Sequence, residues 1–448
     1  MAGGDDLPQP YDAKALAPAK KRQRSASPST PRSPSGSQSG EPVRKLKRPG
    51  QRSRISEAQR EELRQRALQR EREQKEAEAA KQQQQERAAI NDVVRAHYNA
   101  VPERGRDWRK TDSKIKGLRA FNNWVKSCII QKFSPDEDHT PGAMERGISS
   151  GRDLLVLDLG CGKGGDLGKW QQAPQPVELY VGLDPAEISI DQARERYRQM
   201  GQRDRHGGGG GGRGGRGGFY RRPQPRLFEA RFQVKDCFGQ SLEDIDIVRQ
   251  VGFTQSNISS ERGFDVVSMM FCLHYAFENE AKARQMLRNV AGSLKKGGRL
   301  IGTIPNSDAS ENGEIKENDE KEEGEAEETA EWGNETYRVR FPGKTPEDGI
   351  FRPPFGWKYN FFLHEAVEEV PEYVVPWEAF RALAEDYNLE LQYHKSFADI
   401  WATEKDDRTL GPLSERMGVR ERGGGELLVS PDEMEAAAFY VGFCFYKV

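Results

Sequence analysis

The chain has 448 residues, of which 31% are charged and 35% hydrophobic, and it contains 46 glycines and 25 prolines. Such a composition predicts a folded core combined with substantial disorder. No apolar run approaches the ~20 residues of a membrane span, and the N-terminus has no hydrophobic signal core, so we expect neither a membrane protein nor a secreted one. Five cysteines without a C-x-x-C pair or a metal spacing with histidine predict reduced thiols and no metal.

The N-terminal part is basic although the net charge is only −2. Residues 1–55 are rich in Ser, Pro, Lys and Arg without apolar periodicity, which predicts disorder. Within them, Lys20–Arg24 and Arg44–Arg48 are basic clusters, typical of nuclear import signals and also of tails that attract nucleic acid. Ser56–Ala89 has strong helix propensity but too few apolar positions for a coiled coil, so we expect one solvated helix. The sequence therefore predicts a basic head over residues 1–89 and a folded domain over residues 90–448.

The folded domain is expected to begin with helices over residues 90–133. The apolar residues in the second half of this stretch recur at helical spacing and predict a core face: Leu118, Phe121, Val125 and Ile129. Asn122, Asn123 and Lys126 lie off that face, where they are either free to bind a ligand or part of an ordinary polar surface.

Strands and helices then alternate from Asp153 to Phe277, which is typical of a parallel α/β sheet. We expect a helix at Ala281–Leu294 between the fourth and fifth strands. The expected strands are Leu154–Leu159, Glu178–Leu183, Arg231–Lys235, Asp265–Met270 and Arg299–Ile304. Two disordered insertions are expected: a Gly/Arg tract at about residues 201–224, either an RNA-touching patch or a linker, and an acidic tract at about residues 308–331.

After Trp332 the pattern becomes regular again. Alternating residues predict strands at Tyr337–Phe341, Tyr359–Leu363 and Phe439–Phe445, and a helix is expected from Trp377 to Tyr387. We expect these strands to close the sheet in antiparallel fashion. The predicted fold class is α/β, with a seven-stranded, mostly parallel sheet, antiparallel C-terminal strands and helices on both faces.

A glycine-rich turn follows the first expected strand. Its pattern is Gly160-x-Gly162-x-Gly164, and Asp158 lies just inside the strand end. Glycines allow a sharp bend and let a ligand lie against the backbone. Dinucleotide-binding enzymes carry a related but differently spaced pattern. The spacing and the acid are typical of class I methyltransferases that use S-adenosyl-L-methionine (AdoMet), and they favour AdoMet over NAD. Gly160, Gly162 and Gly164 would give backbone access to the methionine part of this cofactor.

Further acids follow the next two expected strands. Asp184 lies about 25 residues after the glycine turn, where it can accept hydrogen bonds from both ribose hydroxyls, and Asp236 can accept from the adenine amino group. Each acid alone is equally well a solvated loop carboxylate or a helix cap. Because ligands of open α/β sheets bind at the carboxyl ends of the strands, three such acids behind a glycine turn favour a cofactor site.

Two absences narrow the reaction. No Asn/Asp-Pro-Pro-Tyr tetrad follows the fourth strand, as methylation of an exocyclic amine in DNA would require, and there is no Pro-Cys nucleophile for attack on a pyrimidine. The fourth strand is followed instead by Phe271–Glu278.

Several segments, spread in order over about residues 92–448, resemble the eukaryotic mRNA cap guanine-N7 methyltransferases. The pairing of Gly-Cys-Gly-Lys-Gly-Gly-Asp-Leu with His-Tyr-x-Phe-Glu is the specific part, and the long basic head is similar to that of fungal members. The segments are Phe121–Trp124, Val156–Leu167, His274–Glu278, Ile304–Ser307 and Val370–Glu372.

The resemblance implies methyl transfer from AdoMet to N7 of the 5′ terminal guanosine cap of RNA, with S-adenosyl-L-homocysteine as product and no metal. It implies cofactor contacts at Lys126, Gly160, Asp184, Asp236 and Tyr275. It implies cap contacts at Asn122, Asn123, Lys163, Lys169, Arg196, His274, Glu372 and Tyr440. The sequence departs at Met270, where some relatives carry glutamine beside the cofactor, although a backbone contact there could survive.

The chemistry of these residue types agrees with that role. Guanine N7 has a free lone pair, so its attack on a sulfonium methyl needs no acid or base residue, and positioning by His274, Tyr275 and Glu372 suffices. A carboxylate at Glu372 can accept from guanine N1 and N2. Tyr275 and Tyr440 offer flat faces, and three cations, Lys163, Lys169 and Arg196, can neutralise the triphosphate. The alternative for His274 and Tyr275 is simple packing, and for Arg196 a solvated helix charge.

The expected partner is 5′-capped RNA, with no membrane, and the expected location is the nucleus. The tail of RNA polymerase II and other capping enzymes are partners that only the resemblance implies. Two alternatives remain: an AdoMet-dependent methyltransferase of another RNA or a small molecule, and a non-catalytic RNA-binding scaffold that retains the fold.

Overall fold

The structure is a computed structural model, and it falls into two units, Met1–Lys75 and Glu76–Val448. In the first unit only residues 65–66 and 69–70 are described, all helical. The expected basic clusters lie outside the described residues, as do most of the expected Gly/Arg tract and most of the expected acidic tract. The described residues are 65–66, 69–70, 93–100, 108, 112–137, 139, 152–207, 226–253, 263–307, 330–346 and 348–448.

A seven-stranded sheet forms the centre of the second unit, in the order β10-β11-β5-β4-β1-β2-β3. Strands β1 to β5 pair in parallel, and β11 pairs antiparallel with both β5 and β10. The predicted mostly parallel sheet with antiparallel C-terminal pairing is therefore confirmed. Its strands are β1 Leu154–Leu159, β2 Val177–Asp184, β3 Glu229–Val234, β4 Phe264–Met270, β5 Leu294–Pro305, β10 Leu389–Ser396 and β11 Tyr440–Lys447.

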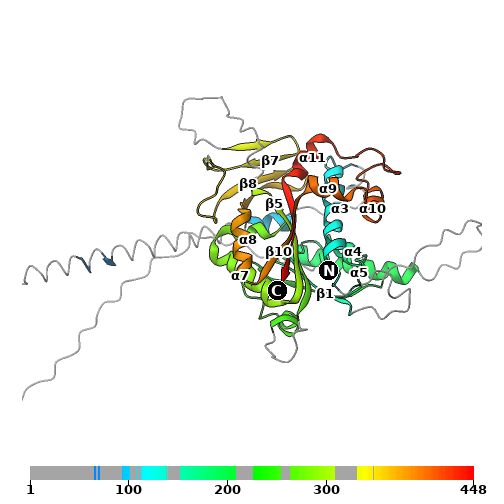
Figure 1. Cartoon of the computed structure of the whole chain (residues 1–448), viewed down its shortest axis with the longest axis horizontal. Coiled ribbons are helices and arrows are strands. Elements are labelled where there is room, and N and C mark those ends of the chain that lie inside the picture. Colours follow the sequence, from blue (N-terminus) through cyan, green and yellow to red (C-terminus); the bar gives the residue numbers. More distant parts are fainter. Residues whose placement is uncertain are drawn as a thin grey trace, which may run out of the picture. The chain divides into compact units, whose positions relative to one another are not determined.

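Helices cover both faces because successive strand residues point to opposite sides. On β1, Val156 belongs to one buried apolar cluster, with α3 and α4, and Leu157 to the other, with α7 and α8. Figure 1 shows α3 among α9, α10 and α11, which follow it by more than 260 residues. The helices are α3 Lys116–Phe133, α4 Leu167–Trp170, α5 Glu187–Gly207, α6 Asp246–Val248, η2 Arg249–Phe253, η3 Leu273–Glu278, α7 Glu280–Ser293, α8 Trp377–Glu385, α9 Phe397–Glu404, α10 Leu410–Met417 and α11 Pro431–Ala438.

A second, four-stranded antiparallel sheet is inserted between β5 and α8, and it corrects one expectation. The predicted strands near Tyr337 and Tyr359 do not close the main sheet but form β7 and β8 of this one. An alternating pattern predicts that a segment is a strand but not which strand it pairs with, because pairing depends on residues far away in the chain. The strands are β6 Glu331–Gly333, β7 Tyr337–Arg340, β8 Lys358–Leu363 and β9 Val367–Tyr373.

The boundaries of both expected insertions also differ from the structure. Glu331, expected in the acidic tract, begins β6, and residues 201–207, expected in the Gly/Arg insertion, continue α5. The β10 strand and helices α9, α10 and α11 were not predicted from the sequence. None of the helices within the described ranges combines the length and the apolar character that a membrane crossing needs.

Two glutamates from elsewhere in the chain bind at the start of α3, one in its first turn and one just before it. The buried carboxylate of Glu433, in the first turn of α11, accepts from the backbone N–H of Leu118 at 3.0 Å and from that of Ser430 at 2.9 Å. The carboxylate of Glu365, between β8 and β9, accepts from the Ser113 hydroxyl at 2.6 Å and from the Lys114 N–H at 3.1 Å. The first turn of a helix leaves N–H groups without partners. These two glutamates therefore fix where α3 begins.

Candidate active site

The glycine turn lies at the carboxyl edge of the main sheet, as predicted. Gly160 and Gly162 have φ of +69° and +51°, which other residues rarely adopt. A Cβ on Gly160 would lie 2.7 Å from Cys272, whereas one on Gly162 would meet nothing within 4 Å. Gly160 is thus required for packing, and Gly162 borders open space in which a ligand can lie against the backbone.

Asp184 ends β2 and is tied to this turn. Its carboxylate accepts from the N–H of Gly162 at 2.9 Å and from that of Ala186 at 2.8 Å. Burial raises its pKa, and these two hydrogen bonds oppose the rise. The residue predicted to bind ribose therefore also holds the shape of the glycine turn.

Asp158 lies beneath the turn, with only 2% of its surface exposed. Its carboxylate accepts from the Tyr180 hydroxyl at 2.6 Å. Burial, reinforced by the negative charge of Asp166, raises the pKa of Asp158 to about 7, although the Tyr180 hydrogen bond opposes this rise. The acid predicted from the motif is thus a buried group that titrates near neutral pH.

The ends of β3 and β4 complete the edge. Asp236 lies two residues beyond β3, where one carboxylate oxygen accepts from the N–H groups of Phe238 and Gly239 at 3.0 and 3.1 Å. Met270 is the last residue of β4 and is buried. The neighbouring strands β1, β2 and β3 therefore each carry an acid at or near the same edge, as the sequence predicted.

A cluster of cations surrounds Asp166, a residue that was not predicted as part of the site. Its carboxylate lies 2.8 Å from Lys126 and 2.6 Å from Lys169. Burial would raise its pKa, but the two lysines hold the pKa of Asp166 well below its usual range. Lys169 also donates to the side-chain oxygen of Asn123 at 2.8 Å. The structure thus brings together three of the predicted ligand-binding residues, one from the cofactor set and two from the cap set.

Two further predicted cap residues lie by the glycine turn. Arg196 on α5 donates to the carbonyl oxygen of Gly164 at 3.1 Å, so its charge is directed towards the turn and not towards solvent. Lys163 lies within the turn itself, half-buried. Positive charge therefore lies both in the glycine turn and on α5 beside it.

A buried acid surrounded by aromatic hydroxyls lies between the two sheets. Glu372 on β9 is 5% exposed, and its carboxylate accepts from Tyr359 on β8 at 2.8 Å. The two residues are direct cross-strand partners. Nε2 of His274, in η3, lies 3.6 Å from the other carboxylate oxygen, and this ring makes no hydrogen bond to the described residues. A buried imidazole and carboxylate with unused capacity are suited to a polar ligand.

Tyrosines extend this cluster. The hydroxyls of Tyr275 and Tyr98 lie 3.0 Å apart, which joins η3 to the helical residues 93–100. Burial and the charge of Glu372 raise the pKa of Tyr440 well above its ordinary value. The Tyr440 ring meets Phe271 edge-on, with centroids 4.8 Å apart. Burial likewise raises the pKa of Tyr275, so these phenols stay neutral near pH 7.

Four further residues at this site were not predicted from the sequence: Tyr98, Asp166, Tyr359 and Phe271. Asp166 had a usable signal, since it lies within the glycine motif. No signal in the sequence pointed to Tyr359, because its position opposite Glu372 depends on an irregular register between β8 and β9. Among the described residues there is no group of His, Cys, Asp and Glu that could hold a metal ion.

Comparisons with known proteins agree with this arrangement. Residues 81–448 match the model of a family described as the mRNA (guanine-N(7))-methyltransferase domain. The mRNA cap guanine-N(7) methyltransferase of Pyricularia oryzae is 66% identical, over 98% of this chain and 91% of its own length. Its counterpart in Aspergillus clavatus is 57% identical, over 95% and 80%. That of Schizosaccharomyces pombe is 43% identical, over 80% and 82%.

Proposed function

The chain belongs to the mRNA (guanine-N(7))-methyltransferase family, and from this we propose how its own residues carry out the reaction. It is an AdoMet-dependent mRNA cap guanine-N7 methyltransferase. The family match and the identity to curated relatives extend over most of the chain. What remains to be assigned is the role of each residue.

The carboxyl edge of the main sheet fits the cofactor. The open space at Gly162 gives room for a ligand against the backbone, and Asp184 and Asp236 lie at the neighbouring strand ends. We assign Asp184 to the ribose hydroxyls, Asp236 to the adenine amine, and Lys126 to the carboxylate of the methionine part. Met270 and Tyr275 border this site. When bound there, AdoMet supplies an electrophilic methyl group.

Glu372 is the observation on which the assignment of the guanine site rests. It is a buried carboxylate, and its hydrogen bond from Tyr359 engages one of its two oxygens. A carboxylate can accept two hydrogen bonds from the N1–H and N2–H groups of guanine. His274, 3.6 Å away and without a hydrogen bond to the described residues, can donate to guanine O6. Adenine lacks this donor pattern, so the pair selects guanine.

Positioning is then the main contribution of the protein. Guanine N7 has a lone pair at neutral pH, so no side chain needs to remove a proton. Holding two reactants in line can be worth roughly 7–11 kcal/mol. Tyr98, Tyr275 and Tyr440 surround Glu372 with flat, neutral faces that can fix the plane of the base.

The cations around the glycine turn are suited to the triphosphate of the cap. Lys169 is held by Asp166 and Asn123, and Arg196 by the Gly164 carbonyl oxygen, so both are oriented before substrate arrives. Oriented cations bind phosphate oxygens with less loss of side-chain entropy. We assign Lys163, Lys169 and Arg196 to the phosphates of the cap. We assign Asn122 to the ribose that is attached to the triphosphate.

We also propose that the protein acts in the nucleus, where the basic clusters Lys20–Arg24 and Arg44–Arg48 would direct it. The transcribing RNA polymerase II, through its tail, and other capping enzymes are proposed as partners. Fluorescence microscopy of the tagged chain, with and without the two clusters, tests the location. Exclusion of the intact chain from the nucleus would refute it.

The reaction is tested by transfer of labelled methyl from AdoMet to RNA with an unmethylated 5′ guanosine cap, beside the same RNA with a plain triphosphate. We expect label only on the capped RNA, recovered as N7-methylguanosine after nuclease digestion. Label at another atom, or on both RNAs, would contradict the assignment of Glu372 and His274 to the base.

A further inference from the structure

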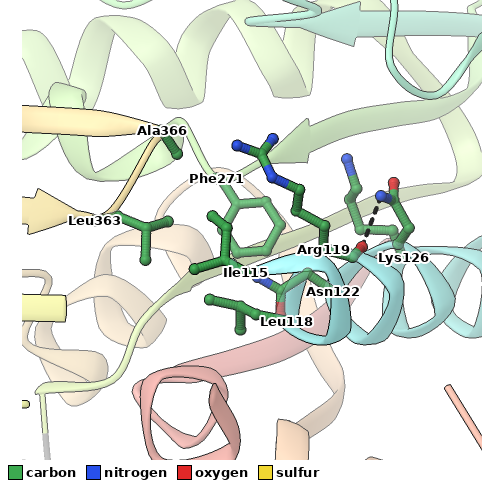
Figure 2. A pocket seen from close by; sticks show the side chains of 9 residues that line it. Ile115, Leu118, Arg119, Asn122, Lys126, Phe271, Leu363 and Ala366 are labelled. Carbon is green, nitrogen blue, oxygen red and sulfur yellow. Dashed lines mark hydrogen bonds between the residues drawn. The ribbon is translucent and has the colours of Figure 1, made fainter. Parts of the chain in front are cut away.

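The two ends of the proposed cofactor site are built differently. Figure 2 shows a cavity whose lining includes Asn122 and Lys126, and both residues are already assigned to the cap and to the methionine part of the cofactor. At the other end, where the adenine is assigned, Asp236 is followed by an irregular loop of residues 237–242. A buried side chain of helix α7, Asn289, supports this loop.

Asn289 lies in the second half of α7 and is only 1% exposed. Its side-chain nitrogen donates to the carbonyl oxygens of Cys237 at 3.1 Å and of Gln240 at 2.7 Å. Its side-chain oxygen accepts from the N–H of Leu242 at 3.2 Å and from the Gln285 side chain at 3.0 Å. An asparagine side chain offers two donors and an oxygen with two lone pairs, so these four hydrogen bonds use its whole capacity.

The loop depends on these hydrogen bonds because it contains neither strand nor helix to pair its backbone. Cys237 and Leu242 are fully buried, so their backbone groups have little access to water. A buried backbone group without a partner costs about as much free energy as a lost hydrogen bond. The amide of Asn289 provides the partners that a neighbouring strand would otherwise supply. It therefore fixes both the shape of the loop and its distance from α7.

The loop in turn orients Asp236. One oxygen of the Asp236 carboxylate accepts from the N–H groups of Phe238 and Gly239, and both residues belong to the loop. Its second oxygen accepts no hydrogen bond from the described residues, so this oxygen can accept from the adenine amine. Because the carboxylate is held by N–H groups of the loop, a movement of the loop would turn the second oxygen away. Binding groups keep a productive geometry only when their neighbours hold them.

We propose that Asn289 is a positioning residue for cofactor recognition: through the loop 237–242 it holds Asp236 in the orientation that selects a purine with a 6-amino group. The inference rests on the proposed function, since it takes Asp236 as the acceptor for the adenine amine. Asn289 acts through the loop and not on the cofactor, because the protein uses all of its hydrogen-bonding capacity. Its loss should therefore weaken the choice of base more than the binding of the rest of the cofactor.

The test compares S-adenosylhomocysteine with S-inosylhomocysteine, in which an oxygen replaces the 6-amino group of the adenine. Dissociation constants are measured by calorimetry on the full chain. We expect the unaltered protein to prefer S-adenosylhomocysteine by about tenfold or more, the value of a hydrogen bond to a charged acceptor. Asn289→Ala should reduce this preference to about threefold or less. Because both ligands are measured on the same sample, a partly unfolded variant does not change the ratio.

Two further variants separate positioning from general structure. Asn289→Asp has nearly the same shape and keeps an acceptor for the Leu242 N–H but not both donors, so it should also reduce the preference, and it replaces the alanine variant if that one does not fold. Asp236→Asn should remove the preference by itself, and adding Asn289→Ala should reduce the ratio no further, because residues that act as a unit are not additive. With saturating capped RNA, Asn289→Ala should raise KM for AdoMet and leave kcat nearly unchanged.

The matched control is Ser293→Ala on the same helix. Ser293 is also buried, its hydroxyl donates to the backbone carbonyl oxygen of Asn289 at 2.6 Å, and among the described residues it makes no hydrogen bond to the loop. This variant should keep the preference. An undiminished preference in the Asn289 variants, equal losses for both ligands, or equal binding of the two ligands by the unaltered protein would each overturn the proposal. Failure of the proposed function would show separately, as absent methyl transfer to GpppA, a guanosine joined through a triphosphate to adenosine, by unaltered protein that still prefers S-adenosylhomocysteine.

Discussion

Replacing Glu372 by glutamine changes the charge of the proposed guanine site with almost no change in the shape of the side chain. The carboxylate should accept two hydrogen bonds from guanine, each worth about 1.5–3 kcal/mol because the acceptor is charged. Glutamine keeps one acceptor and turns a donor towards the base, which leaves buried donors facing each other. We expect a loss of about 3 kcal/mol in transition-state binding, or about 150-fold in kcat/KM, since 1.36 kcal/mol corresponds to tenfold.

The assay is methyl transfer to GpppA and to the same dinucleotide with inosine, which lacks the N2 amine, in place of guanosine. The unaltered protein should prefer guanosine by at least about tenfold, and Glu372→Gln should reduce this ratio to less than about threefold. The affinity for AdoMet should stay unchanged in calorimetry. The matched control is Glu369→Gln, an exposed residue of the same strand that pairs with Arg338. An unchanged preference for guanosine, or an equal loss of cofactor affinity, would refute the role of Glu372.

Three more predictions concern the other acids and Tyr98. Asp158 has a pKa of about 7 when folded but of about 3.9 when unfolded, so the folded state binds the extra proton. The free energy of unfolding without ligand should therefore fall from about pH 4 to about pH 7. It is measured by denaturant titration at several pH values. An Asp158→Asn variant whose unfolding free energy falls with pH as steeply as that of the wild type would contradict this prediction. Asp184→Ala removes the carboxylate that accepts a hydrogen bond from the N–H of Gly162, and calorimetry should detect no AdoMet binding. Retained affinity for AdoMet would refute the assignment of Asp184 to the ribose. Tyr98→Phe removes the hydrogen bond to Tyr275. We expect kcat/KM for GpppA to fall about fivefold, which corresponds to the free energy of one neutral hydrogen bond. An unaltered kcat/KM would show that Tyr98 does not contribute to the site.

The sequence predicted well which residues lie at the carboxyl edge of the main sheet, because the signals are local. The glycine turn, Asp184 and Asp236 each follow a strand whose apolar run is visible in the sequence, and the structure places all three at one edge. Once the strands are recognised as parallel neighbours, their carboxyl ends are expected to lie at the same edge of the sheet. The roles assigned to the individual residues towards the cofactor stay predictions, because a shared edge fixes where a ligand lies but not which atom each side chain contacts.

The proposed guanine site could be predicted only in part, because it depends on contacts between distant segments. Glu372 came from the family resemblance, but its partner Tyr359 follows from the pairing of β8 with β9, where an irregularity near Phe361 sets the register. Tyr98 lies 177 residues from Tyr275 in the chain. The capping of α3 by Glu433 spans 315 residues. No periodicity in one segment reports on such pairs, and each is decided by packing in the folded state.

The four-stranded sheet gives the protein a modular construction. The chain leaves the main sheet after β5 and returns at β10, and within the described residues the two sheets have no strand pair in common. Glu372 and Tyr359 lie on the inserted sheet, whereas the glycine turn, Asp184 and Asp236 belong to the main one. Changes in β8 and β9 would therefore alter Glu372 and Tyr359, to which we assign the choice of base, without changing a strand pair of the main sheet.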